Sequence, residues 1–262
     1  MKTSRWPRQD VRVSRLGFGA MGLCNCFEPL EEEAHIRSVL HSLERGITFI
    51  DTARGYGPSE EIIGKALRQW RGPRPFIATK VESLGADNTR WAVPPPVEDT
   101  FPRGHVRKNA ETSLRLLGVE RLDLLQLHVY WPTWGVRGYW MDELQALRDE
   151  GKVASVGVSA PDHRHDVVLP LVTSGLIDSV QTIVNIFDPL ALDALVPLCQ
   201  HHGVAVIARC VLDEGGLTGA VTEETRFRDG DFRKSYFDSV PRAMYVARLK
   251  RLAAYVPEHA SS

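Results

Sequence analysis

Four side chains able to move or stabilise a proton follow three successive apolar segments of the chain. They are Asp51, Tyr56, Lys80 and His128. A tyrosine has an ordinary pKa of roughly 10, so a nearby ammonium that stabilises the tyrosinate would improve proton exchange at neutral pH. Lys80 suits that role, Asp51 can pair with the lysine, and His128 can orient a carbonyl oxygen. Carbonyl reduction needs such a proton donor together with a separate source of hydride.

The three segments are predicted to be neighbouring parallel strands. Short β-prone runs end at Asp51, Lys80 and His128, and apolar residues recur at helical spacing in the stretches between them. Taken alone, Asp51 could be a turn residue and Tyr56 a cover over the core. Parallel strands bring their carboxyl ends to one edge of a sheet, so we expect the four side chains to converge there.

The alternation of strand and helix continues through the rest of the chain and predicts one α/β domain. We count seven candidate strands, which begin near Leu16, Ile47, Phe76, Leu122, Ala154, Ser179 and Ala205. Unbroken βαβα order implies right-handed crossovers between parallel strands and favours a barrel. We therefore predict a TIM-type (β/α) barrel over residues 1–262 that lacks its last βα unit and is incomplete at the C-terminus.

Composition sets limits on the class of protein. The chain has 262 residues, of which 43% are hydrophobic and 25% charged, with a net charge of -1. These are ordinary globular values and give no basic surface for nucleic acid. We find no signal peptide and no membrane span, and we interpret the four cysteines as reduced thiols. We expect a cytoplasmic protein without a metal site.

The strand-end residues carry a resemblance to a known family. Residues 49–60 read Phe-Ile-Asp-Thr-Ala-Arg-Gly-Tyr-Gly-Pro-Ser-Glu. This motif, together with Lys80 and His128, resembles the aldo-keto reductase family over residues 16–219. The resemblance implies an NAD(P)H-dependent oxidoreductase that reduces an aldehyde or ketone to an alcohol. It implies Tyr56 as general acid, tuned by Lys80 and Asp51.

The same resemblance implies a nicotinamide cofactor across the barrel mouth. Its expected contacts are Ser159, Gln181, Arg209, Leu212 and Gly216. Two departures bear on them: Ala160 stands where the family usually has Asn, and Arg209 stands where many members have an aromatic residue. A guanidinium plane can stack as well. We expect NADP as the cofactor, with NAD as the alternative, and weakened binding if the last βα unit is missing.

Aromatic residues follow His128 closely and suggest a substrate wall. Trp131 and Trp134 come directly after this strand end. They could form the apolar side of a substrate pocket, or they could cap the hydrophobic end of the barrel. Both interpretations stay open at this point.

Two other functions also stay open. The barrel could lack redox activity and use the same four residues for proton-transfer chemistry or for ligand binding, or it could be a noncatalytic partner subunit. An open sheet would expose unpaired strand edges, so we expect a cover for the gap. A partner subunit in a homo-oligomer is our first candidate for this cover, and the chain's own terminal helix is the second.

Overall fold

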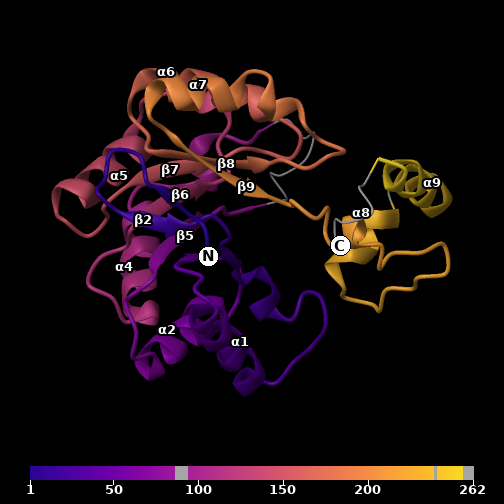
Figure 1. Ribbon diagram of the computed structural model, residues 1–262. Coiled ribbons are helices and arrows are strands. Elements are labelled where there is room, and N and C mark those ends of the chain that lie inside the picture. The colour runs from indigo at the N-terminus through magenta and orange to yellow at the C-terminus, as the bar shows by residue number, and fades with distance from the viewer. Residues whose placement is uncertain (86–93, 239–240, 256–262) are drawn as a thin grey trace.

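Seven parallel strands form one curled sheet in which each strand pairs with the next along the chain. The computed structural model describes residues 1–85, 94–238 and 241–255 (Figure 1). The strands are β3 (Phe18–Gly19), β4 (Phe49–Asp51), β5 (Phe76–Glu82), β6 (Leu124–His128), β7 (Val156–Ser159), β8 (Ser179–Ile183) and β9 (Ala205–Arg209). In the described residues, β3 and β9 are the two edges. This α/β half-barrel confirms the predicted fold class.

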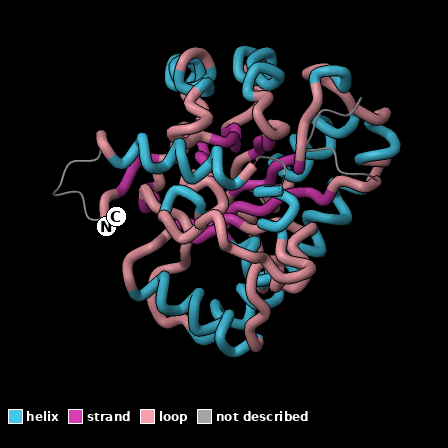
Figure 2. Tube along the Cα trace, turned by 90° about the vertical axis from the view of Figure 1, so that its right-hand side faces the viewer, coloured by secondary structure: helices cyan, strands magenta, loops and turns pink. Residues whose placement is uncertain are grey.

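Helices cover the outside of the sheet, as Figures 1 and 2 show. The α-helices of the barrel are α1 (Glu32–Glu44), α2 (Ser59–Gln69), α3 (Val97–Thr100), α4 (His105–Leu117), α5 (Tyr139–Asp149), α6 (Leu169–Ser174) and α7 (Leu195–His202). Short 3-10 turns are η1 (Ala20–Cys24), η2 (Pro132–Trp134), η3 (His165–Val168), η4 (Leu190–Leu192) and η5 (Gly216–Thr218). In α1, Ile36, Val39 and Leu43 are buried. Their spacing places one apolar stripe against the sheet.

A short hairpin closes the end of the barrel opposite the strand ends that carry the ionisable residues. It consists of β1 (Thr3–Arg5) and β2 (Arg12–Ser14), paired antiparallel. Trp6 follows β1 and packs against Phe76, with ring centroids 4.6 Å apart, and against Phe49 at 5.9 Å. These rings fill the floor of the interior. Chemistry is therefore confined to the carboxyl ends of the strands.

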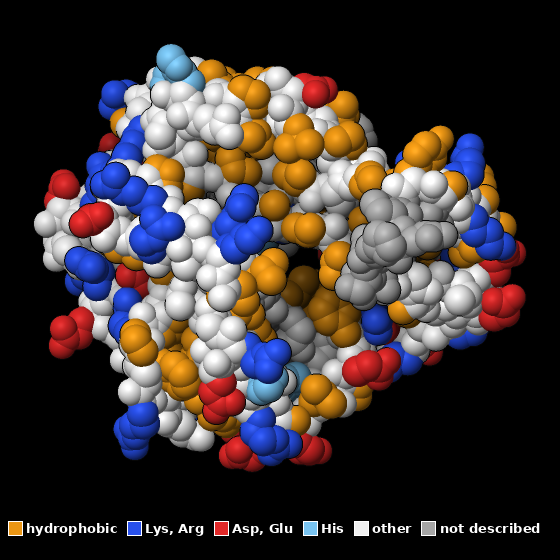
Figure 3. Space-filling model, viewed as in Figure 1, with side chains coloured by type: hydrophobic (Ala, Val, Ile, Leu, Met, Phe, Trp, Pro, Cys, Tyr) orange, Lys and Arg blue, Asp and Glu red, His pale blue; other side chains and the backbone are white. Residues whose placement is uncertain are grey.

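The last described segment connects the loops that follow the two edge strands. It contains α8 (Phe232–Asp238) and α9 (Arg242–Ala253), which lie beside the sheet in Figure 1. The Phe232 amide donates to the carbonyl of Cys26, just after β3, at 2.8 Å. The Tyr245 hydroxyl donates to Asp213, just after β9, at 2.7 Å. In Figure 3 the surface is hollowed beside this segment, and hydrophobic side chains are visible inside the hollow.

Two segments differ from what their residue patterns indicate. The apolar spacing of 189–201 is typical of one helix, but η4 and α7 divide it. The charged stretch 222–238 is typical of an irregular loop, yet it contains α8, whose Phe237 is buried. Tertiary burial decides such short helices, since their own propensity is weak.

Candidate active site

Lys80 and Asp51 form an ion pair at the mouth of the barrel. The Lys80 ammonium lies 2.8 Å from Asp51 Oδ2 and 3.0 Å from Oδ1. It also donates to the carbonyl oxygen of Thr52 at 2.8 Å. Burial alone would lower the pKa of Lys80, but the charge and hydrogen bonds of Asp51, together with Tyr56, outweigh it and the net pKa is raised. Lys80 is therefore a permanent cation, fixed by three acceptors.

Tyr56 lies against this cation and against His128. The Lys80 nitrogen is 5.1 Å from the centre of the Tyr56 ring, and the His128 ring meets the tyrosine edge-on at 5.6 Å. Burial raises the pKa of Tyr56, and the attraction of Lys80 offsets only part of that rise. Lys80 thus acts on the tyrosine in the predicted direction, but the net pKa of Tyr56 is raised because burial has the larger effect. Tyr56 keeps its proton, which suits a proton donor.

His128 is neutral at physiological pH. It ends β6 directly opposite Ser159 of β7 in the sheet register. Burial lowers the pKa of His128 to about 3, helped by the positive charges of Lys80 and Arg209. A neutral imidazole can donate one hydrogen bond to a carbonyl oxygen without competing with Tyr56 for the proton. The four residues predicted from the sequence therefore do come together.

Two glutamines extend this constellation into the barrel interior. Gln181 Nε2 donates to Asp51 Oδ2 at 3.1 Å, and Gln126 Nε2 donates to Gln181 Oε1 at 3.0 Å. Gln126 is fully buried on β6. Gln181 thus shares Asp51 Oδ2 with Lys80, and Gln126 holds Gln181 in place. Sequence reasoning missed Gln126, although an amide between two leucines of a buried strand was a readable signal.

Gln181 is consequently occupied by the protein itself. Its oxygen accepts from Gln126, and one amide hydrogen is directed to Asp51. A primary amide carries two hydrogens, so one donor remains for a ligand. Ser159, the neighbouring residue in the register, is almost fully buried at the end of β7. Both side chains lie at the mouth, and the cofactor contact predicted for them stays a prediction.

Arg209 ends β9 and points toward the same mouth. Its Nη2 donates to Asp162 Oδ1 at 2.6 Å and to the carbonyl oxygen of Ala160 at 3.2 Å. Burial would lower the pKa of Arg209, but Asp162 and Cys210 together outweigh it and the pKa is raised. Arg209 is therefore a fixed cation at the position where many members of the resembled family have an aromatic residue. Asp162 was not predicted as a partner.

The loop after β9 holds the other two predicted cofactor residues. Leu212 is 57% exposed, and the preceding Val211 is 52% exposed, so this loop presents apolar surface. Gly216 is buried, and a Cβ added to it would lie 2.1 Å from the Tyr245 hydroxyl. Packing against Tyr245 alone therefore requires a glycine at this position. A nucleotide contact at Gly216 stays a prediction.

Comparison with known proteins decides the family. The model of the aldo/keto reductase family matches residues 15–258. The chain belongs to this family.

This chain covers only part of the length of individual relatives in the family. A probable aldo-keto reductase of Glycine max is 32% identical over 220 residues, which are 80% of this chain and 59% of the relative. The NADH-specific methylglyoxal reductase of Escherichia coli is 28% identical over 228 residues, covering 82% and 68%. The chain thus spans about three fifths of the Glycine max protein.

Two solved structures of aldo-keto reductase type share the fold along nearly the whole chain. The holo form of an aldo-keto reductase from Bacillus halodurans has 26% identity and a TM-score of 0.76, covering 99% of this chain and 78% of that one. The glycerol dehydrogenase of Gluconobacter oxydans has 27% identity and a TM-score of 0.77, covering 99% and 79%. Their likeness supports the half-barrel arrangement described above.

The two tryptophans proposed as a substrate wall are packed into the core of the half-barrel. Trp131 is 5% exposed and Trp134 is 8% exposed. The Trp134 ring meets Phe101 edge-on at 5.5 Å, and its indole nitrogen donates to the carbonyl oxygen of Pro95 at 2.9 Å. Most of the surface of both rings is therefore covered by the protein. A pocket role for either ring stays a prediction.

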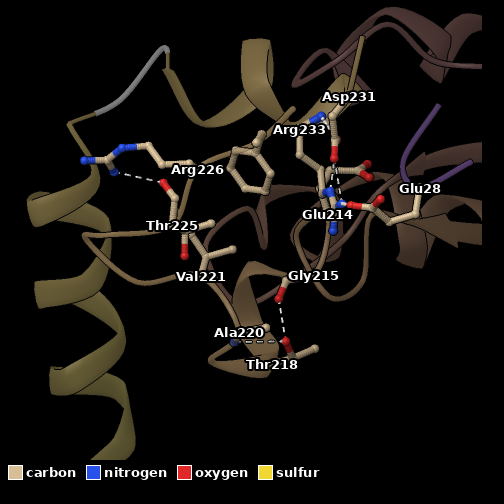
Figure 4. Close-up of a pocket in the computed structure, with 11 residues that line it drawn as sticks. Glu28, Glu214, Gly215, Thr218, Ala220, Val221, Thr225, Arg226, Asp231 and Arg233 are labelled. Carbon is tan, nitrogen blue, oxygen red and sulfur yellow. Dashed lines mark hydrogen bonds and ion pairs between the residues drawn. The ribbon is translucent and has the colours of Figure 1, made fainter. Parts of the chain in front are cut away.

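The family's strand-end site is separate from a cavity of about 360 Å³ near the C-terminal segment. Figure 4 shows the residues that line it. Glu28 comes from the loop after β3, Glu214 and Gly215 come from the loop after β9, and Arg233 is held by Asp231 at 2.7 Å. None of the four strand-end residues lines the cavity. It therefore belongs to the bridge between the two sheet edges.

Within residues 1–85, 94–238 and 241–255, no three His, Cys, Asp or Glu side chains are grouped to hold a metal ion. The same ranges contain no helix with the length and apolarity to cross a bilayer. The cytoplasmic location predicted from the sequence stays a prediction.

Proposed function

We propose that this protein reduces an aldehyde or a ketone to an alcohol, with a reduced nicotinamide nucleotide as the hydride donor. The observation that carries the proposal is the contact between protonated Tyr56, neutral His128 and the Lys80–Asp51 pair. These groups can deliver one proton to an oxygen and can stabilise negative charge on it, which is what a carbonyl requires as it accepts hydride. Membership of the aldo/keto reductase family supports the reaction class.

The role of each residue in the proposed reaction follows from its charge state in the structure. A reduced nicotinamide nucleotide, when bound, supplies the hydride that forms the new C–H bond at the carbonyl carbon. The Tyr56 hydroxyl gives its proton to the carbonyl oxygen, and the carbonyl group is thereby converted to an alcohol. Lys80 stabilises the tyrosinate that remains, since its ammonium lies 5.1 Å from the ring centre. The neutral imidazole of His128 orients the oxygen by a hydrogen bond.

The residues present fit a nicotinamide nucleotide at the mouth. Leu212 and its neighbour Val211 leave 57% and 52% of their surfaces exposed beside the site, where an apolar ring could cover them. Ser159, Gln181, Arg209, Leu212 and Gly216 are the residues that would hold the nucleotide. The choice between NADPH and NADH is part of the proposal: we expect NADPH to bind weakly and NADH to compete with it.

Substrate and assembly are proposed more broadly. The small 2-oxoaldehyde named for the Escherichia coli relative is one candidate class, and an aromatic aldehyde is another. The exposed backbone of the edge strands β3 and β9 motivates the proposal that a second copy of the chain covers the gap. Light scattering after size-exclusion chromatography tests this: a protein that remains a monomer at high concentration contradicts it.

One experiment tests the reaction itself. NADH or NADPH is mixed with methylglyoxal, an aromatic aldehyde or a ketone, and the loss of reduced-nucleotide absorbance is followed. We expect turnover with at least one aldehyde and none with Tyr56→Phe. Tyr130→Phe is the matched control, because Tyr130 is buried and its hydroxyl only reaches the carbonyl oxygen of Gly135, at 3.3 Å.

A second candidate function is supported by one specific observation. Gln181 is largely used by Asp51 and Gln126, and Ala160 has no amide, so two nicotinamide contacts are weakened. The same Tyr56 and His128 could then serve proton transfer or ligand binding without hydride. A folded protein that binds no nicotinamide nucleotide and reduces none of the carbonyls would favour this second function.

A further inference from the structure

Arg209 and Asp162 form an ion pair between two strand ends at the mouth. Arg209 ends β9, and Asp162 lies three residues beyond the end of β7. Their side chains are 23% and 17% exposed, and the Nη2–Oδ1 distance is 2.6 Å. A second bond from the same Nη2 to the carbonyl oxygen of Ala160, at 3.2 Å, fixes the plane of the guanidinium. The charge of Arg209 is thus held in one place and partly balanced by Asp162.

The sheet register places this guanidinium on the side of the reacting groups. Ile207 packs against the rings on the barrel floor, so it points inward. Side chains two residues apart in a strand share a face. Arg209 therefore points inward like Ile207, but lies two residues closer to the mouth. The register partner of Ile207 is Gln181, which reaches Asp51. The charge of Arg209 also lowers the pKa of Tyr56 and of His128, so it acts across the site.

Any group that gives hydride to a carbonyl held by Tyr56 and His128 must lie in contact with that carbonyl. A nicotinamide ring is neutral when reduced and carries one positive charge when oxidised. This charge would arise at the mouth, where the charge of Arg209 acts on Tyr56 and His128, whereas Asp162 lies in the loop after β7 and pairs with the guanidinium. Like charges at short range in a half-buried site disfavour the oxidised ring.

We propose that the Arg209–Asp162 pair makes the mouth bind the reduced form of a nicotinamide nucleotide in preference to the oxidised form. The inference rests on the proposed function and adds Asp162 as a positioning residue. Arg209 provides the discrimination, because it lies on the inward face of β9 and its charge acts on Tyr56 and His128. Asp162 limits the discrimination, because it cancels part of the field and holds the guanidinium plane.

The pair predicts opposite effects for its two members. Asp162→Asn keeps the hydrogen-bonding shape but removes the compensating charge, so the oxidised form should bind less well relative to the reduced form. Arg209→Gln removes the cation and leaves Asp162 negative, so the oxidised form should bind more tightly relative to the reduced form. We expect the ratio of the two dissociation constants to change by about tenfold in each direction, as for one unit charge several Å away in partly screened surroundings.

Equilibrium titration of the purified chain with NADH and with NAD⁺, followed by intrinsic tryptophan fluorescence, measures this ratio without turnover. Arg209→Lys keeps the charge and should keep the preference for the reduced form. The double variant Arg209→Gln/Asp162→Asn should give an intermediate ratio. Asp166→Asn is the matched control, since Asp166 pairs with Arg164 at 2.9 Å on the surface of the same loop.

The outcomes separate the inference from the function on which it rests. Opposite shifts in the two single variants, with an unchanged ratio in Asp166→Asn, support the inference. If both forms bind and every variant weakens them equally, Arg209 and Asp162 are only structural and the inference is overturned, while the proposed function stands. If neither form binds the folded wild-type protein, both are overturned.

Discussion

The two halves of the barrel mouth differ in how firmly their side chains are held. On the side of β4 to β6, Lys80 is 1% exposed and three acceptors fix its ammonium. On the side of β9, Arg209 is held by Asp162 and Ala160, but Leu212 in the loop that follows is 57% exposed. The half around Lys80, the fixed half, is therefore preorganised, whereas the half after β9, the open half, also presents exposed apolar surface. A ligand should add order to the second half and leave the first as it is.

This difference predicts that chemistry and binding can be separated by mutation. Tyr56→Phe removes one hydroxyl from the fixed half and should lower kcat by roughly 10²- to 10⁴-fold, the usual contribution of a general acid. Nucleotide affinity and the melting temperature should stay within error of the wild type. Steady-state kinetics and a thermal melt are the measurements. Carbonyl reduction close to the wild-type rate would remove Tyr56 from the mechanism.

The residues of the fixed half could be predicted from the sequence because they belong to local patterns. Asp51 and Tyr56 share one strand-to-loop motif, and Lys80 and His128 end apolar runs of ordinary strand length. The order of the seven strands followed from periodicity in the same way. Periodic apolar spacing is set by the neighbouring layer, so it survives in the sequence.

What the sequence did not reveal depends on contacts that close only in three dimensions. Gln126 acts through Gln181 on Asp51, three residues brought together by the curl of the sheet. Asp162 meets Arg209 across two strand ends. The direction of the Tyr56 pKa depends on burial outweighing the charge of Lys80, and neither magnitude is visible in a motif.

Trp134 tests whether the segment after His128 belongs to the core or to a substrate pocket. The ring is 8% exposed and packs on Phe101 and Tyr130. Trp134→Ala should therefore lower the free energy of unfolding by about 3–5 kcal/mol, the range for large aromatic truncations in cores. Urea denaturation measures this value.

Kinetics on the same variant, and on Trp131→Ala, decide the wall hypothesis. A substrate wall predicts that the Michaelis constant rises more for bulky apolar carbonyls than for small ones. Equal changes for both sizes of substrate, together with a large loss of stability, would place both tryptophans in the core alone.

His128 should make the stability of the fixed half depend on pH. Its pKa is about 3 in the folded protein and about 6.5 when unfolded. Between these values the unfolded state binds the proton and the folded state does not, so stability falls as the pH drops below about 6.5. From pH 7 to pH 4.5 the wild type should lose on the order of 2 kcal/mol more than His128→Asn.

Urea titrations of the two proteins at both pH values give this difference directly. Other groups titrate in both proteins, so their contributions cancel in the comparison. Parallel losses of stability would mean that His128 takes up its proton in the folded state near the ordinary pKa.

The smallest effect is expected for Leu212→Ala, on the affinity for a nucleotide. It tests whether the open half of the mouth, after β9, binds the nucleotide. Leu212 is exposed beside the mouth, so Leu212→Ala should leave the free energy of unfolding almost unchanged. If a nucleotide covers this side chain, the variant loses buried apolar area worth about 1 kcal/mol, which is roughly a fivefold rise in the dissociation constant.

Leu190→Ala is the matched control, because Leu190 is 55% exposed on η4, in the turn that precedes α7. A rise in the dissociation constant for Leu212→Ala alone would assign the open apolar surface to the nucleotide. Equal affinities in both variants and the wild type would mean that this half of the mouth serves something other than nucleotide binding.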